Sequence, residues 1–216
     1  MNLAELKEAV EKTLVEEYGL NWLNSGAKGQ HESSLEYAML MLNGGAELPF
    51  RTRLMAKIQN KIQNERFAVT EWVTKDNLEK KEKRADIAIL DRSDSKKIPS
   101  SVIELKSNFL SQAGQVKGRF FKDVEKWVFP DCKVGSKLFL YWVTDVTRLD
   151  HDDFLKGYVS VTPKADQKSD VIQNALSEVA ALYGLKSEPP INCFVETSYP
   201  FPKTEFNTRF YFYGTD

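Results

Sequence analysis

The chain has 216 residues, of which 42% are hydrophobic and 12% aromatic, so it can bury a substantial core and is not typical of a disordered or purely scaffolding protein. Thirty basic residues against 31 acidic ones give a net charge of −1, which argues against extensive nucleic-acid binding because proteins that grip phosphates usually carry a basic excess. No apolar run is long enough to span a membrane, and the first residues do not have the pattern of a targeting signal, so we expect a soluble, cytoplasmic protein without a membrane partner.

The first part of the chain has the apolar spacing of helices. Residues 1 to about 18 predict an amphipathic helix, and residues 19–30 read as a loop. Residues 33–42 predict a second helix, which ends at an Asn-Gly-Gly sequence. A third helix is expected to begin near Glu47, just before a proline that suits a first turn, and to run to about Asn64.

A different periodicity begins at Phe67. Residues 67–74 are rich in β-formers and predict a strand, whereas residues 75–84 are highly charged and predict a turn. Residues 85–90 and 101–106 predict two further strands, joined by a polar loop at 91–99. Two or three of these strands are expected to follow one another in hairpin connection.

The next two elements are a helix and a central strand. Residues 111–128 predict a helix that ends before Pro130, with a buried face made of Val116, Phe120, Val124 and Trp127. Residues 137–144 form a nearly continuous apolar run, which is typical of a strand covered on both faces.

The end of the chain predicts one more helix and two strands. The helix is expected over residues 169–183, with Gly184 as its stop, and its predicted core face consists of Val171, Ile172, Ala175, Leu176, Val179 and Leu182. Residues 192–197 and 209–213 predict the strands. The whole pattern predicts a single α/β domain over residues 1–216, with N-terminal helices (1–45), a core with a mixed sheet flanked by helices (46–145), and a C-terminal helix and strands (146–216).

Several kinds of active site have little support in this sequence. Cys132 and Cys193 lack zinc-binding or redox spacing, so reduced and mostly buried thiols are the favoured interpretation. His31 and His151 both fall in predicted loops with no obvious nucleophile nearby, which disfavours Ser-His and Cys-His hydrolases. A phosphate-binding glycine loop is also missing from the sequence, which disfavours nucleotide hydrolysis.

The strongest chemical signal is a set of charges inside the predicted strands. Alternate side chains of a strand share one face, so Glu104 and Lys106 project together, opposite Ile103 and Leu105. Asp86 lies on the preceding strand, and a hairpin register that places it beside Glu104 would bring two carboxylates to one metal ion.

Two carboxylates beside a lysine form a suitable site for a divalent cation and a water molecule. Mg²⁺ prefers oxygen ligands, commonly one or two carboxylates completed by water and phosphate, and the backbone carbonyl of Leu105 could add another ligand. Lys106 would hold the attacking water and counter the charge that develops on a phosphate. This combination suits the hydrolysis of a phosphodiester.

The order helix, strand, strand with Asp, strand with Glu-x-Lys, helix, strand resembles the PD-(D/E)XK superfamily of nucleases, which has the restriction-endonuclease-like fold. The resemblance covers roughly residues 47–143. It implies that Asp86 and Glu104 are metal ligands and that Lys106 is the catalytic lysine. It further implies supporting roles for Glu47, where many members carry an extra acid, and for Gln115, where many place a glutamine. One departure is Ala85, which stands where the superfamily's name has proline.

The resemblance also implies a cofactor and a substrate. Mg²⁺ is expected, with Mn²⁺ as a substitute, and the substrate is nucleic acid, with DNA favoured and a homodimer compatible with cutting both strands. A local basic excess over residues 117–137 supports this partner, although charge runs are often only solvated helix faces.

Three alternatives stay open at this point. Glu104 and Lys106 could form an exposed ion pair on an edge strand. Glu71 could be a further acid of the site or the exposed face of an edge strand. The domain could also be a non-catalytic relative that binds nucleic acid or a protein, or an α/β domain of unrelated activity in which the motif is accidental.

Overall fold

The computed structural model describes residues 1–20, 36–37, 47–62, 64–75, 82–95, 98–109, 113–128, 134–148, 166–197 and 204–216. Its strands form one six-stranded mixed sheet in the order β1-β2-β3-β4-β6-β5. The strands are β1 (Arg66–Lys75), β2 (Glu82–Asp91), β3 (Ser101–Phe109), β4 (Ser136–Arg148), β5 (Lys186–Thr197) and β6 (Thr204–Gly214). β3 and β4 run parallel, and the other neighbours are antiparallel.

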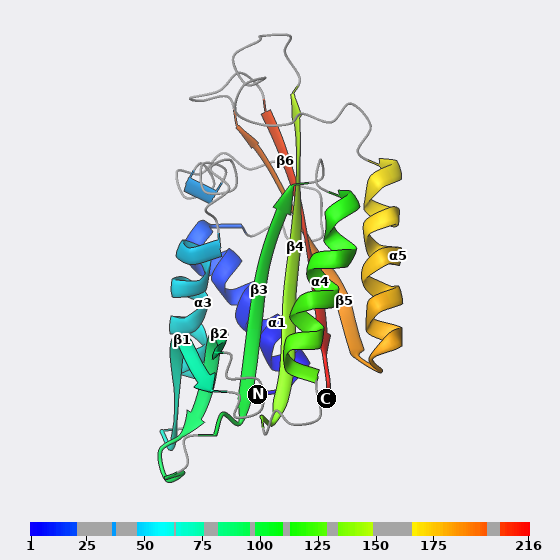
Figure 1. Cartoon of the computed structure of the whole chain (residues 1–216). Coiled ribbons are helices and arrows are strands. Elements are labelled where there is room, and N and C mark those ends of the chain that lie inside the picture. Colours follow the sequence, from blue (N-terminus) through cyan, green and yellow to red (C-terminus); the bar gives the residue numbers. More distant parts are fainter. Residues whose placement is uncertain are drawn as a thin grey trace.

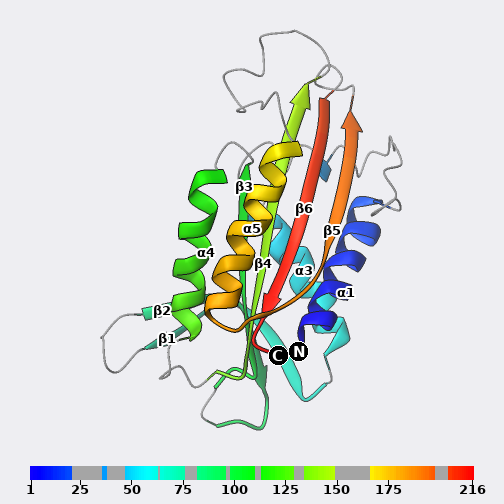
Figure 2. The ribbon, with the colours of Figure 1, turned by 90° about the vertical axis from the view of Figure 1, so that its right-hand side faces the viewer.

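Helices cover both faces of this sheet, as Figures 1 and 2 show. The α-helices within the described residues are α1 (Leu3–Lys12), α3 (Glu47–Lys61), α4 (Ala113–Val128) and α5 (Asp166–Leu182), and a wider π-helical turn, η1 (Thr13–Glu17), continues α1. α1 and α3 lie on one face, and α4 and α5 lie together on the other (Figure 2). The predicted α/β class with a mixed sheet is therefore confirmed.

The two-residue period of β3 divides the protein into two cores. Ile103 and Leu105 are buried with α1 and α3, whereas Val102 is buried with α4 and α5. Along α4, the predicted apolar face at Val116, Phe120, Val124 and Trp127 is fully buried, as the sequence indicated. Both cores therefore meet at β3, which runs between helices on its two sides.

Most predicted elements are confirmed, although several strands are longer than predicted, and the two C-terminal strands, β5 and β6, are about twice the predicted length. The predicted helix at 47–64 ends at Lys61, and the predicted strand at 137–144 is the longer β4, which lies inside the sheet. The helix predicted over residues 33–42 lies outside the described residues, except for Glu36 and Tyr37, which are helical. None of the helices that the structure describes is long and apolar enough to cross a membrane.

Two sequence interpretations are wrong. The charged sequence predicts a turn at Glu82, Lys83 and Arg84, but these residues pair with Lys75, Thr74 and Val73 as the start of β2. Charged residues are tolerated there because their backbones form the ladder while long side chains reach water. On α5, the apolar spacing predicts that Val171 and Leu182 face the core, but they are 59% and 69% exposed. From residue 170 onward, the fully buried side chains of this helix form a narrow stripe, which consists of Ile172, Leu176, Val179 and Ala180.

The connection from β3 to β4 predicts a clear difference between two glycine substitutions. A Cβ at Gly135 would clash with the backbone carbonyl of Ser100, whereas one at Gly118, inside α4, would meet nothing within 4 Å. We expect Gly135→Ala to lower the free energy of unfolding by about 1–3 kcal/mol. Gly118→Ala should raise it by roughly 0.5–1 kcal/mol, because glycine is a poor helix former. Urea unfolding of both variants measures the difference, and equal effects would contradict this packing.

Candidate functional site

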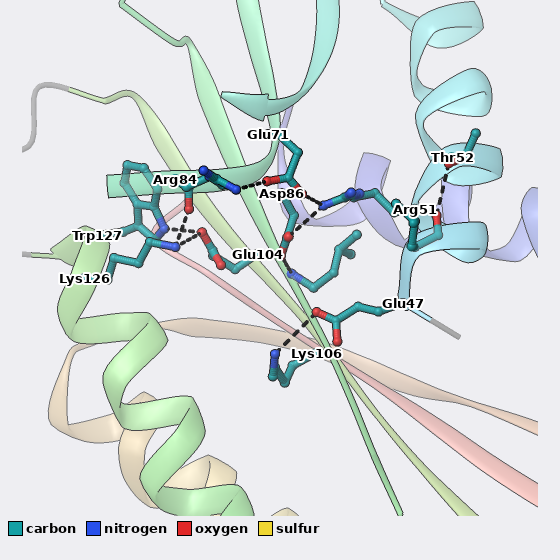
Figure 3. A network of polar contacts seen from close by, with 12 residues as sticks. Glu47, Arg51, Thr52, Glu71, Arg84, Asp86, Glu104, Lys106, Lys126 and Trp127 are labelled. Carbon is teal, nitrogen blue, oxygen red and sulfur yellow. Dashed lines mark hydrogen bonds and ion pairs between the residues drawn. The ribbon is translucent and has the colours of Figure 1, made fainter. Parts of the chain in front are cut away.

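Glu104 is a buried carboxylate on an interior strand. The residue is 6% exposed, and its Oε1 accepts hydrogen bonds from Lys126 Nζ at 2.7 Å and from Trp127 Nε1 at 2.5 Å (Figure 3). Both donors come from the last turns of α4. An isolated buried carboxylate is very unfavourable, so this pair of donors explains how β3 can carry the charge inside.

Burial nevertheless controls the protonation of Glu104. Desolvation raises its pKa to about 7 from an ordinary 4.5, while Lys126 lowers it and the charge of Asp86 raises it. The ion pair with Lys126 is therefore outweighed by the loss of water around the carboxylate. Near neutral pH, Glu104 exchanges between its charged and neutral forms.

Asp86 lies where β2 and β3 separate. The antiparallel ladder between them ends at the pair Ile87 and Ile103, and beyond it the Oδ2 atom of Asp86 accepts a hydrogen bond of 2.8 Å from the Leu105 backbone N–H. The Asp86 side chain thus takes the place of a backbone carbonyl as the acceptor for the Leu105 N–H. Continuing the same register places Asp86 opposite Glu104, the arrangement that the sequence left undetermined.

Arg51 supplies the counter-charge on the other side. It projects from α3, is nearly buried, and its NH1 donates to Asp86 Oδ1 at 3.1 Å and to Glu71 (Figure 3). Glu71 also accepts from Arg84 at 3.2 Å and has a φ of 54°, which is unusual for a residue other than glycine. The bridge through Arg51 connects Glu71 to Asp86.

Lys106 lies two residues after Glu104 on β3, and its side chain contacts Glu47 at the start of α3. Lys106 Nζ lies 3.4 Å from Glu47 Oε1, and the Lys106 side chain is 35% exposed. Burial raises the pKa of Glu47, Lys106 lowers it, and Asp86 raises it. The structure therefore brings Glu47, Asp86, Glu104 and Lys106 into one electrostatic cluster.

A further buried pair adjoins the cluster. The Tyr141 hydroxyl of β4 donates to Asp123 Oδ2 of α4 at 2.6 Å. Burial raises the pKa of Asp123 despite this hydrogen bond and despite the nearby charges of Lys106 and Lys126. Tyr141 is also the register partner of Lys106, so Asp123 faces the lysine from the helix that covers it.

Gln115 lies apart from these acids. It is in the first turn of α4, and its Oε1 accepts a hydrogen bond of 2.7 Å from Arg119 NH2. No contact to Asp86, Glu104 or Lys106 is seen for it, so its supporting role in catalysis stays a prediction.

The alternative of a surface ion pair is wrong. β3 is an interior strand, Glu104 is buried, and the partners seen for Glu104 and Lys106 are Lys126 and Glu47, respectively. For Glu71, both interpretations hold in part, because it lies on the edge strand β1 and is exposed, yet it shares Arg51 with Asp86.

Sequence reasoning missed the cations that hold the acids. Arg51 follows Glu47 by four residues, which places both on one face of α3, and this spacing was an available signal. In the sequence, Lys126 is one of several charges in a basic run, and Trp127 belongs to the apolar face of a predicted helix. Nothing local indicates that an adjacent Lys and Trp would converge on a glutamate 22 and 23 residues earlier.

The oxygen atoms of this site could bind a hard cation such as Mg²⁺ only if water or phosphate supplied the remaining ligands. Within the described ranges, no three His, Cys, Asp or Glu side chains lie together as a ready metal group. Asp86 and Glu104 supply two carboxylates from adjacent strands, and Mg²⁺ often uses just one or two with water and phosphate for the rest. Both hydrogen-bond donors to Glu104, from Lys126 and Trp127, contact Oε1, and neither of these two bonds uses Oε2. The oxygen chemistry therefore fits a divalent cation.

Comparison with known proteins adds no identification. No protein-family model matches the sequence, and neither the curated proteins nor the solved structures yield a match.

The raised pKa of Glu104 predicts a pH-dependent cost to folding. Its pKa is about 7 in the folded chain and 4.5 ordinarily, so the folded state binds more protons between these values, and stability falls as pH rises through this window. Relative to Glu104→Gln, the wild type should lose on the order of 3 kcal/mol between pH of about 4.5 and about 8.

Urea unfolding of both proteins across this pH range measures the difference. Glu47 and Asp123 also have raised pKa values, but they are present in both proteins and cancel in the comparison. Parallel pH profiles would contradict the burial of a titrating Glu104.

Proposed function

We propose that this protein is a metal-dependent nuclease that hydrolyses phosphodiester bonds of nucleic acid, with DNA as the favoured substrate. One observation supports it above all. Asp86 and Glu104 lie in continuing register where β2 and β3 separate, and Lys106 follows two residues later on the Glu104 face. The proposal accords with the resemblance to the PD-(D/E)XK nucleases.

Asp86 and Glu104 would hold the cation, Mg²⁺ or Mn²⁺, with the Leu105 carbonyl as a further ligand. When bound, the cation supplies Lewis-acid polarisation of the phosphate and a more acidic water. A water molecule attacks phosphorus and releases a proton to solvent, the P–O bond to the leaving oxygen breaks, and the leaving oxygen takes up a proton from solvent. Lys106 donates to the attacking water and to a non-bridging oxygen as charge develops there. Glu47 orients the lysine through their contact of 3.4 Å.

The charges of the site can rearrange without leaving an acid unpaired. Arg51 contacts both Asp86 and Glu71, so it can stay with Glu71 when Asp86 turns to a cation. Lys126 contacts Glu104 and also the Arg84 backbone carbonyl, so it too has a second partner. The basic side chains thus hold the two acids in place before a metal arrives.

The same pairing favours a second candidate. Asp86 and Glu104 each contact a basic side chain, and the described residues include no ready three-ligand metal group. A non-catalytic domain of this architecture, which binds nucleic acid or a protein partner, would need only these paired charges and no metal site. Metal binding and cleavage separate the two candidates.

Cleavage tests the first candidate directly. We expect the purified protein to cleave plasmid, linear duplex, single-stranded DNA or RNA in Mg²⁺ or Mn²⁺ and not in EDTA. Lys106→Met and Glu104→Gln should each lose at least about a hundredfold in rate, since both remove stabilisation of the transition state.

The matched control is Lys117→Met, because Lys117 is an exposed lysine paired with Glu178 on the outer surface of α4 and α5. It should cleave like the wild type. Retained cleavage by the Lys106 and Glu104 variants, with contaminating nuclease excluded, would rule out the proposed mechanism.

Metal binding gives a second, independent test. Mn²⁺ or Mg²⁺ should raise the melting temperature of the wild type, because a ligand that binds only the folded state stabilises it. Asp86→Asn should abolish this shift while its amide oxygen can still accept from the Leu105 N–H. Glu71→Gln, which disturbs the same Arg51, should keep the shift. If neither ion shifts the melting temperature of the wild type, the second candidate, a non-catalytic binding domain, becomes the better interpretation.

A further inference from the structure

The edge strand β1 changes the direction of its side chains at Glu71. Val69 and Trp72 are three residues apart, so a regular strand would turn them to opposite faces. Both nevertheless pack against the core that lies on the side of α4 and α5. Between them, Glu71 has a φ of 54°, which residues other than glycine rarely adopt. The regular alternation of the strand is therefore broken at this glutamate.

β2 is irregular at the facing position. Ala85 and Ala88 are also three residues apart, and both pack against that same core. Asp86 lies between them, and the register of the flanking pairs places it opposite Glu71. An unfavourable backbone conformation persists only where the surrounding contacts hold it, and such positions cluster at functional sites. Here the two irregular positions carry the two acids that share Arg51.

Arg51 contacts both acids through one nitrogen. Its NH1 donates to Asp86 Oδ1 at 3.1 Å and to Glu71 (Figure 3). For its buried Nε donor, no acceptor is found among the described residues. The strongest arginine–carboxylate pairs use two parallel N–H groups of the guanidinium, and neither acid has that geometry here. The arginine is thus divided between two carboxylates rather than fully held by one.

Each of the two acids can do without this division. The hydrogen bond from Arg51 lowers the pKa of Glu71, which therefore stays ionised at neutral pH and can keep the arginine. Glu71 also accepts a hydrogen bond of 3.2 Å from Arg84, on the exposed edge of the sheet. Asp86 accepts from the Leu105 N–H through its other oxygen, so it keeps a partner when the arginine leaves.

We propose that Glu71 is a positioning residue of the metal site, which acts by keeping Arg51 when a divalent cation takes its place at Asp86. The inference rests on the proposed function, because it takes Asp86 to be a metal ligand. The arginine and the cation compete, since each neutralises the same carboxylate. Glu71 favours the exchange because the arginine leaves one acid for another instead of losing its charged partner.

Mn²⁺ binding without nucleic acid tests this exchange. The electron paramagnetic resonance signal of free Mn²⁺ gives the dissociation constant for each variant. Glu71→Gln should still bind Mn²⁺ but with a dissociation constant about fivefold higher, because Arg51 then stays with Asp86. Arg51→Met should lower the constant by about the same factor, because the competing charge is gone. The two substitutions thus change the metal affinity in opposite directions.

A double variant separates the exchange from the general field of the charges. In the Arg51→Met background, Glu71→Gln should have no further effect, as a residue that acts only through the arginine must. Arg84→Met is the matched control, because it removes a positive charge that contacts Glu71 and for which no contact to Asp86 is described. It should change the affinity by less than about twofold, since salt screens exposed charges. Circular dichroism and melting temperature verify that each variant is folded.

A measurement on the wild type does not depend on any substitution being tolerated. The Nε–H group of Arg51 is buried, so its proton is protected from exchange with water and gives an NMR signal of its own. Mg²⁺ should shift this signal as the guanidinium moves from Asp86 to Glu71. A signal that stays unchanged when Mg²⁺ is bound would overturn the exchange.

The outcomes separate this inference from the proposed function. If the wild type binds Mn²⁺ and Glu71→Gln binds it equally well, or loses as much affinity in the Arg51→Met background, the exchange is overturned while the nuclease stands. The same holds if Arg84→Met tightens binding as much as Arg51→Met. If the expected changes appear without any cleavage, the exchange stands in a metal-binding domain that is not a nuclease. If the wild type binds no Mn²⁺, the exchange is overturned together with the metal-dependent function.

Discussion

The burial of the Glu104 carboxylate on an interior strand sets the position of everything around it. A charged group in that place needs donors, and α4 supplies Lys126 and Trp127 to the same oxygen. The helix is thereby fixed against β3 at one end, while its apolar stripe fills the core beneath. Because the two elements run antiparallel, this anchor also decides that Asp123 faces Lys106 and that Arg119 faces Asn108.

The early separation of β2 from β3 is the second determinant of the site. A complete ladder would occupy the Leu105 N–H with a backbone carbonyl, and here the Asp86 carboxylate takes that role. Strand separation thus opens the sheet at the point where two acids lie side by side. Arg51 from α3 compensates Asp86 from one face of the sheet, and Lys126 from α4 compensates Glu104 from the other. A charge-balanced cluster of this kind is stable without a metal and still offers oxygen ligands.

Much of the architecture was predictable because it depends on local periodicity. The apolar face of α4, the doubly buried β4 and the glycine that ends α5 all follow from spacing within one element, and all are confirmed. The errors arise where contacts between elements override the local pattern. Glu82–Arg84 are charged yet belong to β2, because a strand needs only backbone partners there. Val171 and Leu182 have apolar side chains, but the neighbours of α5 leave them exposed.

The candidate site likewise combines features that the local sequence predicts with features that depend on tertiary contacts. The sequence alone determined that Glu104 and Lys106 share one face of a strand and that Ile103 and Leu105 face the core, since the two-residue period of a strand is a property of the backbone. The tertiary structure alone decided that Asp86 lies beside Glu104, that Arg51 and Lys126 hold these acids, and that Gln115 turns to Arg119. Register and helix packing depend on contacts between residues far apart in the chain, and no local pattern encodes which of many charged side chains will meet.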